Sequence, residues 1–231
     1  MSAQERPERG GRVDKFAERR EELAWAAVQT LAELGYARTS LREIAQNSEF
    51  SHGVFHYYFK DKADLITCCV RLYKAHCVTR YDRVTAEAAT PEALIDGFID
   101  GLAASAREEA HMHRLWYDMR AQALFEPDFR ADVAEIDKSL EAMIWRVVSR
   151  LAELTRVPQT LPPALLYAMF DGIFQQCLLK HIAGDPGAIR DMEVQARALL
   201  SQFTGRPTAA PLRGVRKRAL RVRAVPSGVA G

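Results

Sequence analysis

The fold is decided by residues 39–62, which read TSLREIAQNSEFSHGVFHYYFKDK. Ser40 opens an S-x-x-E capping box, and this pattern predicts a short helix over residues 41–47. Ser51 can cap a second short helix over residues 52–58. Two short helices joined by a turn of about four residues form a helix-turn-helix, whose second helix enters the major groove of DNA.

Outside this segment, apolar residues recur at helical spacing and strand signals are almost absent. Asp14 can cap a first helix that ends before Gly35, and Asp61 can cap a long helix that follows the helix-turn-helix. Proline and glycine clusters separate the later segments and place five further helices, near residues 91–106, 108–124, 128–155, 162–182 and 187–203. The sequence therefore predicts an all-α fold of about nine helices.

The net charge of +2 is unevenly distributed along the chain. Residues 1–20 hold six basic and four acidic side chains, residues 206–231 hold seven basic and none acidic, and the remainder carries −7. The tail is rich in Pro, Gly, Ala and Arg without periodicity, which predicts that it is disordered. Basic ends on an acidic body indicate a polyanion partner, although a basic tail can equally serve solubility.

Several classes of protein are excluded by the sequence. No stretch is apolar enough for a membrane span, and the first 15 residues lack the apolar core of a secretory signal. We therefore expect a cytoplasmic protein whose four cysteines are free thiols. The absence of a Gly-rich phosphate loop and of a G-x-S-x-G elbow predicts no enzyme activity and no cofactor. His111 and His113 are two residues apart, on different helix faces, so no metal site is predicted.

The helix-turn-helix segment contains three groups of spaced residues, which are Thr39-Ser40-Leu41-Arg42-Glu43-Ile44-Ala45, Phe50-Ser51-x-Gly53 and His56-Tyr57-Tyr58-Phe59-x-x-Lys62-x-x-Leu65. With these groups, residues 17–77 resemble the DNA-binding domain of the TetR family of bacterial transcriptional regulators. The resemblance implies an all-helical dimer with an N-terminal three-helix reading head and a fourth helix that acts as a lever. It also implies a larger C-terminal domain that binds a small molecule and dimerises.

The resemblance divides the chain into four expected parts. These are a basic flexible arm (1–13), a DNA-binding domain (14–77, with the helix-turn-helix at about 40–59), a ligand-binding and dimerisation domain (78–205), and a basic disordered tail (206–231). The expected function is that of a ligand-responsive repressor, which binds a palindromic DNA operator as a homodimer and is released by a small-molecule effector. The alternative is a non-specific DNA-compacting protein that binds through its basic tail.

The resemblance also implies which residues contact DNA. The hydroxyls of Thr39 and Ser40 would meet a phosphate, and Arg42 would reach the backbone or a base. His52 and Val54 would face base edges. The remaining predicted contacts are Lys15, Ser51, Gly53, His56, Tyr57, Lys60 and Lys62.

Four positions of the DNA-binding domain carry further information. Gly53 costs its helix about 1 kcal/mol relative to alanine, and close approach of the backbone to DNA would explain that cost. Lys15 lies in a basic first turn that can enter an adjacent minor groove. Glu49 stands where the family commonly has a turn glycine, so the turn is either left-handed and strained or altered. His56 replaces a frequent tyrosine.

Aromatic and polar residues of the C-terminal half can form the walls of a small-molecule pocket, or an ordinary helical core. The pocket candidates are Trp116, Tyr117, Arg120, Gln122, Trp145, Phe170, Phe174 and Gln175. Arg120 can pair with an anionic effector or with an internal carboxylate such as Asp171. Packing within one chain competes with the dimer contacts that we expect at Leu166, Leu178, Leu199 and Phe203.

Overall fold

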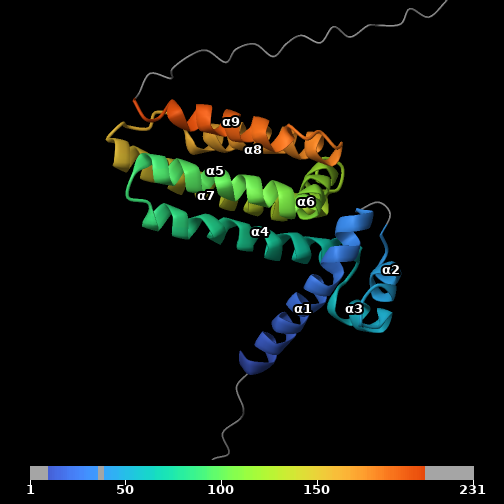
Figure 1. Cartoon of the computed structure of the whole chain (residues 1–231). Helices are drawn as coiled ribbons and strands as arrows, with labels where there is room; N and C mark the ends of the chain where they lie inside the picture. The colour runs from blue at the N-terminus through green and yellow to red at the C-terminus, as the bar shows by residue number, and fades with distance from the viewer. Residues whose placement is uncertain (1–9, 36–38, 206–231) are drawn as a thin grey trace, which may run out of the picture.

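The computed structural model describes residues 10–35 and 39–205. Over these residues it contains nine α-helices, one short 3-10 turn and no strand (Figure 1). The elements are α1 (Gly10–Leu34), α2 (Leu41–Gln46), α3 (His52–Tyr58), α4 (Lys62–Glu87), α5 (Pro91–Glu108), α6 (Ala110–Gln122), η1 (Pro127–Phe129), α7 (Arg130–Thr155), α8 (Pro163–Ile182) and α9 (Ala188–Ser201). Residues 1–9 of the predicted arm and the predicted tail lie outside the described residues. None of the described helices is long and apolar enough to cross a membrane.

The predicted signals at helix starts produce most of the expected caps. The Ser40 hydroxyl accepts a hydrogen bond from the Glu43 N–H at 3.2 Å, and the Glu43 carboxylate accepts one from the Ser40 N–H at 2.8 Å, which completes the capping box. Asp61 caps α4 with its side chain. The first helix differs from the prediction, because α1 begins at Gly10 and continues through Asp14. Extending a formed helix costs little, so the turn before Asp14 is helical and not part of a flexible arm.

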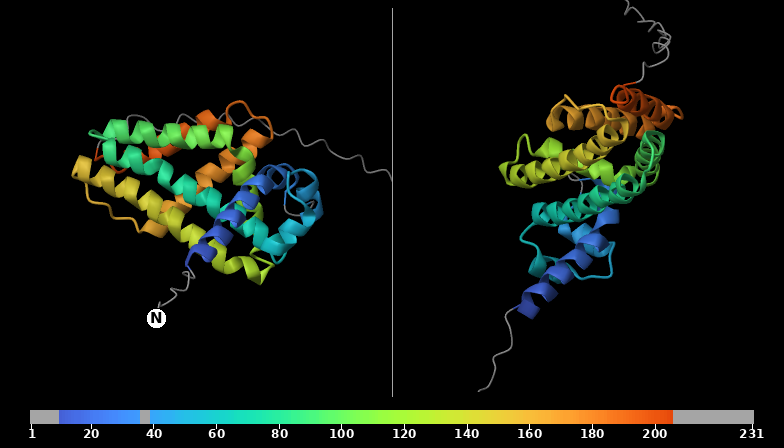
Figure 2. Two further views of the ribbon diagram at one scale, coloured as in Figure 1. Left: turned by 90° about the horizontal axis from the view of Figure 1, so that it is seen from below. Right: turned by 90° about the vertical axis from the view of Figure 1, so that its left-hand side faces the viewer.

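Helices α1, α2 and α3 form a small head at one end of the molecule, and α5 to α9 form a larger bundle (Figures 1 and 2). Helix α4 begins beside α1 and then runs along the bundle, so it belongs to both parts (Figure 1). Helices α8 and α9 lie on the side of the bundle away from α4. One apolar core runs from the head through α4 into the bundle.

The head is attached to the first half of α4 by buried side chains. Leu23 of α1 and Leu65 and Ile66 of α4 are fully buried in the shared core. The Cys69 thiol also donates a hydrogen bond to the Ala24 carbonyl, with a sulfur-to-oxygen distance of 3.2 Å. Burial of each large apolar side chain contributes about 1.5–3 kcal/mol, so the head and this part of α4 form one firm unit.

The second half of α4 packs closely on α5 at two glycines. A Cβ atom added at Gly97 would lie 2.7 Å from Val84, and one added at Gly101 would lie 2.6 Å from Tyr81. Any larger residue at these positions would push the two helices apart, because packed interiors hold few voids. Helix α4 is therefore packed firmly against α1 in its first half and against α5 in its second half.

Candidate functional site

The exposed face of α3 carries a group of polar and aromatic side chains. His52, Gly53, His56 and Tyr57 are exposed, Tyr57 with 70% of its surface, whereas Phe55 is fully buried. The four exposed positions have the spacing i, i+1, i+4 and i+5, which places them on one side of the helix. A short helix that is anchored on one side and polar on the other can enter a DNA major groove.

The structure brings together two side chains to which the sequence analysis assigns separate contacts. The Nε2 atoms of His52 and His56 are 3.0 Å apart, so one imidazole donates a hydrogen bond and the other accepts it. The signal for this contact is the four-residue spacing, because such residues are neighbours on a helix. DNA bound against α3 would therefore contact the two hydrogen-bonded rings together.

Two of the predicted phosphate contacts are engaged within the protein. Thr39 is 4% exposed, and its hydroxyl donates to the Gly35 carbonyl at 2.7 Å. The Ser40 hydroxyl donates to the Glu43 carboxylate at 2.9 Å while it caps α2. The Thr39 hydroxyl therefore departs from the predicted role, because the turn holds it inward. Arg42 is exposed, as a phosphate contact requires.

The other predicted DNA contacts differ in their accessibility. Val54 is partly buried against the core of the head, so only part of its side chain can meet a thymine methyl group. Lys62 is partly buried at the first position of α4. Ser51 precedes α3 and makes no side-chain capping hydrogen bond, unlike the cap that its position predicts. Lys15 and Lys60 are exposed.

The turn between α2 and α3 is built without a left-handed residue. Among the described residues, Arg156 is the sole non-glycine residue with a positive φ, at 59°. Glu49 is therefore not in the left-handed conformation. Of the two alternatives for this turn, the structure contains the altered turn. The Ser48 hydroxyl supports this turn, because it accepts a hydrogen bond from the Phe50 N–H at 3.3 Å.

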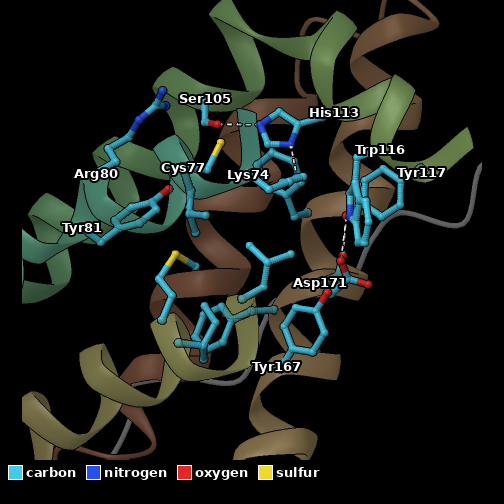
Figure 3. Close-up of a pocket in the computed structure, with 16 residues that line it drawn as sticks. Lys74, Cys77, Arg80, Tyr81, Ser105, His113, Trp116, Tyr117, Tyr167 and Asp171 are labelled. Atoms are coloured by element: carbon cyan, nitrogen blue, oxygen red, sulfur yellow. Dashed lines mark hydrogen bonds between the residues drawn. The ribbon is translucent and has the colours of Figure 1, made fainter. Parts of the chain in front are cut away.

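A cavity lies in the bundle among helices α4 to α8 (Figure 3). Its volume is about 70 Å³. The predicted pocket residues that line it are Trp116, Tyr117, Phe170 and Phe174. The other predicted residues do not line it: Arg120, Gln122 and Trp145 are partly buried elsewhere, and Gln175 is exposed on α8.

Arg120 forms ion pairs inside the protein. Its guanidinium pairs with Asp171 and, at 3.5 Å, with Asp137. The Tyr117 hydroxyl donates to Asp171 at 2.9 Å, and the Tyr167 hydroxyl donates to Asp137 at 2.6 Å. Of the two alternatives for Arg120, the structure contains the internal salt bridge. Its charge is thereby balanced before any effector binds.

A second polar network is buried in the cavity wall, and the sequence analysis did not identify it. Lys74 is 5% exposed, and its ammonium group donates to Nδ1 of His113 at 3.1 Å. The His113 Nε2 atom is then the protonated one, at 2.6 Å from the Ser105 hydroxyl and 2.8 Å from the Tyr73 hydroxyl. Tyr73 donates onward to Glu109 at 2.9 Å. A lysine inside a long helix is normally a surface residue, so only the tertiary contacts identify this one.

Burial controls the protonation of this network. It lowers the pKa of Lys74 to about 8, so the ammonium form predominates at pH 7. Burial, together with the charges of Lys74 and Arg80, holds the pKa of His113 well below its usual value, and the imidazole is neutral. Burial alone would raise the pKa of Glu109, but hydrogen bonds from Arg80 and Tyr73 outweigh it and keep the pKa below its usual value. The wall thus presents an ammonium group beside a neutral imidazole.

Three potential metal ligands meet in the same network. Ligand atoms of Cys77, Glu109 and His113 lie within 4.8 Å of one another. Glu109 is already paired with Arg80, and His113 already accepts from Lys74. Two cationic side chains beside the three ligands oppose the binding of a metal ion, so we assign the cluster to the hydrogen-bond network. Cys77 is a free thiol, as are the other three cysteines.

The residues predicted at a dimer interface pack inside the subunit. Leu166, Leu178 and Phe203 are buried, and Leu199 is partly buried. A different set of large apolar side chains is exposed on α8 and α9, namely Leu165, Met169, Leu179, Ile182 and Val194. Because α8 is apolar on most of its faces, residue spacing alone could not show which face points inward.

Comparison with known proteins is consistent with this arrangement. Residues 25–67 match the family described as bacterial regulatory proteins, tetR family. The chain is 26% identical over 157 residues to the HTH-type transcriptional regulator BetI of Stenotrophomonas maltophilia (strain R551-3), a match that covers 68% of this chain and 79% of that protein.

Solved structures share the whole fold. A TetR-family transcriptional regulator from Rhodococcus sp. superposes with a TM-score of 0.66 at 16% identity, over 81% of this chain and 99% of that one. A transcriptional regulator from Saccharomonospora viridis, solved in complex with choline, superposes with a TM-score of 0.64 at 16% identity, over 81% of this chain and 95% of that one.

The likenesses therefore cover both the reading head and the bundle that contains the cavity. The family match coincides with the helix-turn-helix, whose exposed helix has the form that groove recognition requires. Residues 25–67 thus belong to the tetR family of bacterial regulatory proteins, and the chain around them has the fold of solved TetR-family regulators.

Proposed function

We propose that this regulator is a homodimeric repressor in the cytoplasm, which binds a palindromic operator and is released by a small molecule bound in the cavity. The observation that carries the proposal is the double role of α4. Its N-terminal end contributes Leu65 and Ile66 to the core shared with α1, and its middle contributes Lys74 and Cys77 to the cavity wall. A ligand that displaces α4 within the bundle therefore also displaces the reading head.

Helix α6 provides a second connection between the cavity and the head. Its residues His113 and Trp116 line the cavity, and the intervening Arg114 donates to the carbonyl of Glu33 in α1 at 2.9 Å. An effector that binds better when the two heads are too far apart for the operator would lower DNA affinity. Thermodynamic linkage then requires DNA to lower effector affinity by the same factor.

The proposed dimer forms through the outer face of α8 and α9. Leu165, Met169 and Leu179 follow helical spacing on this face and are 45%, 37% and 65% exposed. Gly172 lies between them, and a Cβ atom added there would meet nothing within 4 Å, which leaves room for a partner helix. Two-fold symmetry would present two heads to half-sites about one helical turn, or a multiple of it, apart.

The proposal is tested by footprinting the full chain on genomic DNA fragments. We expect discrete protected palindromes. Uniform coverage of every fragment would instead support non-specific compaction through the basic tail. Deletion of residues 206–231 tests the tail separately. If the tail contacts phosphates, DNA binding by the shortened protein should depend less steeply on salt concentration than binding by the full chain.

A further inference from the structure

The cavity wall contains more hydrogen-bond donors than the protein satisfies. The Lys74 ammonium group has no ion pair within 4.0 Å among the described residues, and its hydrogen-bond partner is the neutral imidazole of His113. The indole N–H of Trp116 is buried and has no hydrogen-bond partner. Both side chains line the cavity (Figure 3). Unsatisfied buried donors favour a ligand that brings acceptors.

The acidic groups that line or adjoin the cavity are already engaged elsewhere. Glu109 is paired with Arg80 and accepts from Tyr73. Asp171 is paired with Arg120 and accepts from Tyr117. Neither carboxylate is within ion-pair distance of Lys74, so the positive charge of Lys74 is not balanced by a direct contact.

Two aromatic faces at the site, those of Trp116 and Tyr167, are occupied by the protein's own cations. The Lys74 nitrogen lies 5.3 Å from the centre of the Trp116 ring, and the Arg120 guanidinium carbon lies 5.9 Å from that ring. Arg120 also lies 5.9 Å from the centre of the Tyr167 ring. A cationic ligand needs such a face and would meet like charge there. These contacts disfavour a quaternary ammonium ligand in this chain.

The rest of the cavity is apolar and small. Leu140, Met143 and Ile144 of α7 and Phe170 and Phe174 of α8 line it. Its volume is about 70 Å³. A short aliphatic chain suits this space better than a long acyl chain.

We propose that the effector of this regulator is a short-chain organic carboxylate, whose carboxylate accepts hydrogen bonds from Lys74 and whose chain packs against α7 and α8. The inference rests on the proposed function in that the cavity occupant is the effector. Binding would complete the charge balance that the apo cavity lacks. Because Lys74 is on α4, the carboxylate acts on the helix that carries the reading head.

The test is isothermal titration calorimetry of the full chain with butyrate, bracketed by acetate and hexanoate. Its matched analogues are 1-butylamine, which keeps the chain and reverses the charge, and choline. We expect at least one carboxylate to bind and neither cation to bind. Lys74→Met should weaken carboxylate binding about tenfold or more, since it removes a charged hydrogen-bond donor. Lys138→Met, at an exposed lysine of α7, should leave binding unchanged.

Thermal melting of both variants establishes that they are folded. The titration of the unaltered chain shows, without either variant, whether the cavity binds carboxylates or cations. Tighter binding of choline or butylamine than of every carboxylate overturns the inference, as does full carboxylate affinity in folded Lys74→Met protein or no carboxylate binding at all. Operator binding is measured separately. Release of operator by choline alone would leave the proposed function standing and the carboxylate inference wrong. If a carboxylate binds but the protein protects no specific operator, the carboxylate inference stands and the proposed function is wrong.

Discussion

Arg20 of α1 and Asp64 of α4 form a two-pronged ion pair, with nitrogen-to-oxygen distances of 2.7 and 3.3 Å. Arg20 also donates to the carbonyl of Tyr58 at 2.7 Å, and Asp64 accepts from the Lys60 N–H at 3.0 Å. The pair therefore joins the start of the lever helix to both α1 and the end of the reading helix.

Asp64→Asn should lower the free energy of unfolding by about 1–2 kcal/mol, because it weakens charged hydrogen bonds in a partly buried site. Partial burial alone would raise the pKa of Asp64, but hydrogen bonds from Arg20 and Lys60 outweigh it and hold the pKa below its usual value. The contribution is thus present at neutral pH and lost as the pH falls below about 4. Urea unfolding of the unaltered protein and of Asp64→Asn measures the stability difference at pH 7 and its loss at pH 3. Asp82→Asn, in a more exposed pair with Arg146, is the control and should change little.

Gly53→Ala should raise stability and lower operator affinity. The nearest atom to an added Cβ would be the Ser51 hydroxyl at 4.0 Å, so alanine fits and gains about 1 kcal/mol of helix propensity. The same methyl group would stand on the face that enters the groove. Gly101→Ala is the contrasting variant, since its Cβ would overlap Tyr81 and destabilise the bundle. Thermal melting measures the stability, and fluorescence anisotropy with a footprinted operator measures the DNA affinity. Unchanged DNA affinity in Gly53→Ala would show that α3 does not enter the groove.

Removal of the Tyr57 hydroxyl should weaken binding to all DNA sequences, whereas His52→Ala should reduce discrimination between operators. Tyr57→Phe keeps the ring beside Phe16, whose centroid lies 6.3 Å away, and so leaves the head packed. We expect a loss of about 1–3 kcal/mol in discrimination for His52→Ala, as for other base contacts. Competition binding with operator and random DNA checks both. Phe125→Ala, at a ring that is 79% exposed in the turn after α6, should have no effect.

Leu179→Glu should convert the dimer into a monomer. The side chain is 65% exposed on the proposed interface, and two glutamates across a two-fold axis would be desolvated without partners. Light scattering should report a mass of 26.0 kDa in place of twice that value. Leu124→Glu changes a leucine that is 75% exposed outside α8 and α9 and should leave the mass unchanged. A dimeric Leu179→Glu protein would place the interface elsewhere.

Lys74 should make the stability of the protein rise with pH above 8. Its pKa is about 8 in the folded state because of burial and about 10.4 when unfolded, so between these values the unfolded chain binds more protons. The free energy of unfolding should increase by about 3 kcal/mol across this window relative to Lys74→Met. Subtracting the unfolding free energy of Lys74→Met from that of the unaltered protein removes much of the contribution of other titrating groups. The groups that face Lys74 are Tyr73, Cys77, Glu109, His113, Arg120 and Asp171. A flat difference from pH 8 to pH 10.5 would show that the lysine is hydrated.

The sequence by itself determined the features that depend on neighbours along the chain. The capping box at Ser40, the helix-turn-helix and the nine helices follow from propensity, capping and spacing, which act within about one turn. The motif groups around Gly53 and Tyr57 were enough to identify the family, because their spacing is set by the local geometry of the head.

Only the tertiary structure decided the features that depend on which helix faces meet. Lys74 became part of a cavity because α4 is covered by α5, α6 and α7, and nothing in its local sequence signals that cover. Arg120 found Asp137 and Asp171 on two other helices, and α8 turned Leu166 inward and Leu165 outward although both are equally apolar. Burial is a property of the packed bundle, so the balance between desolvation and pairing that shapes the cavity exists only once the helices are assembled.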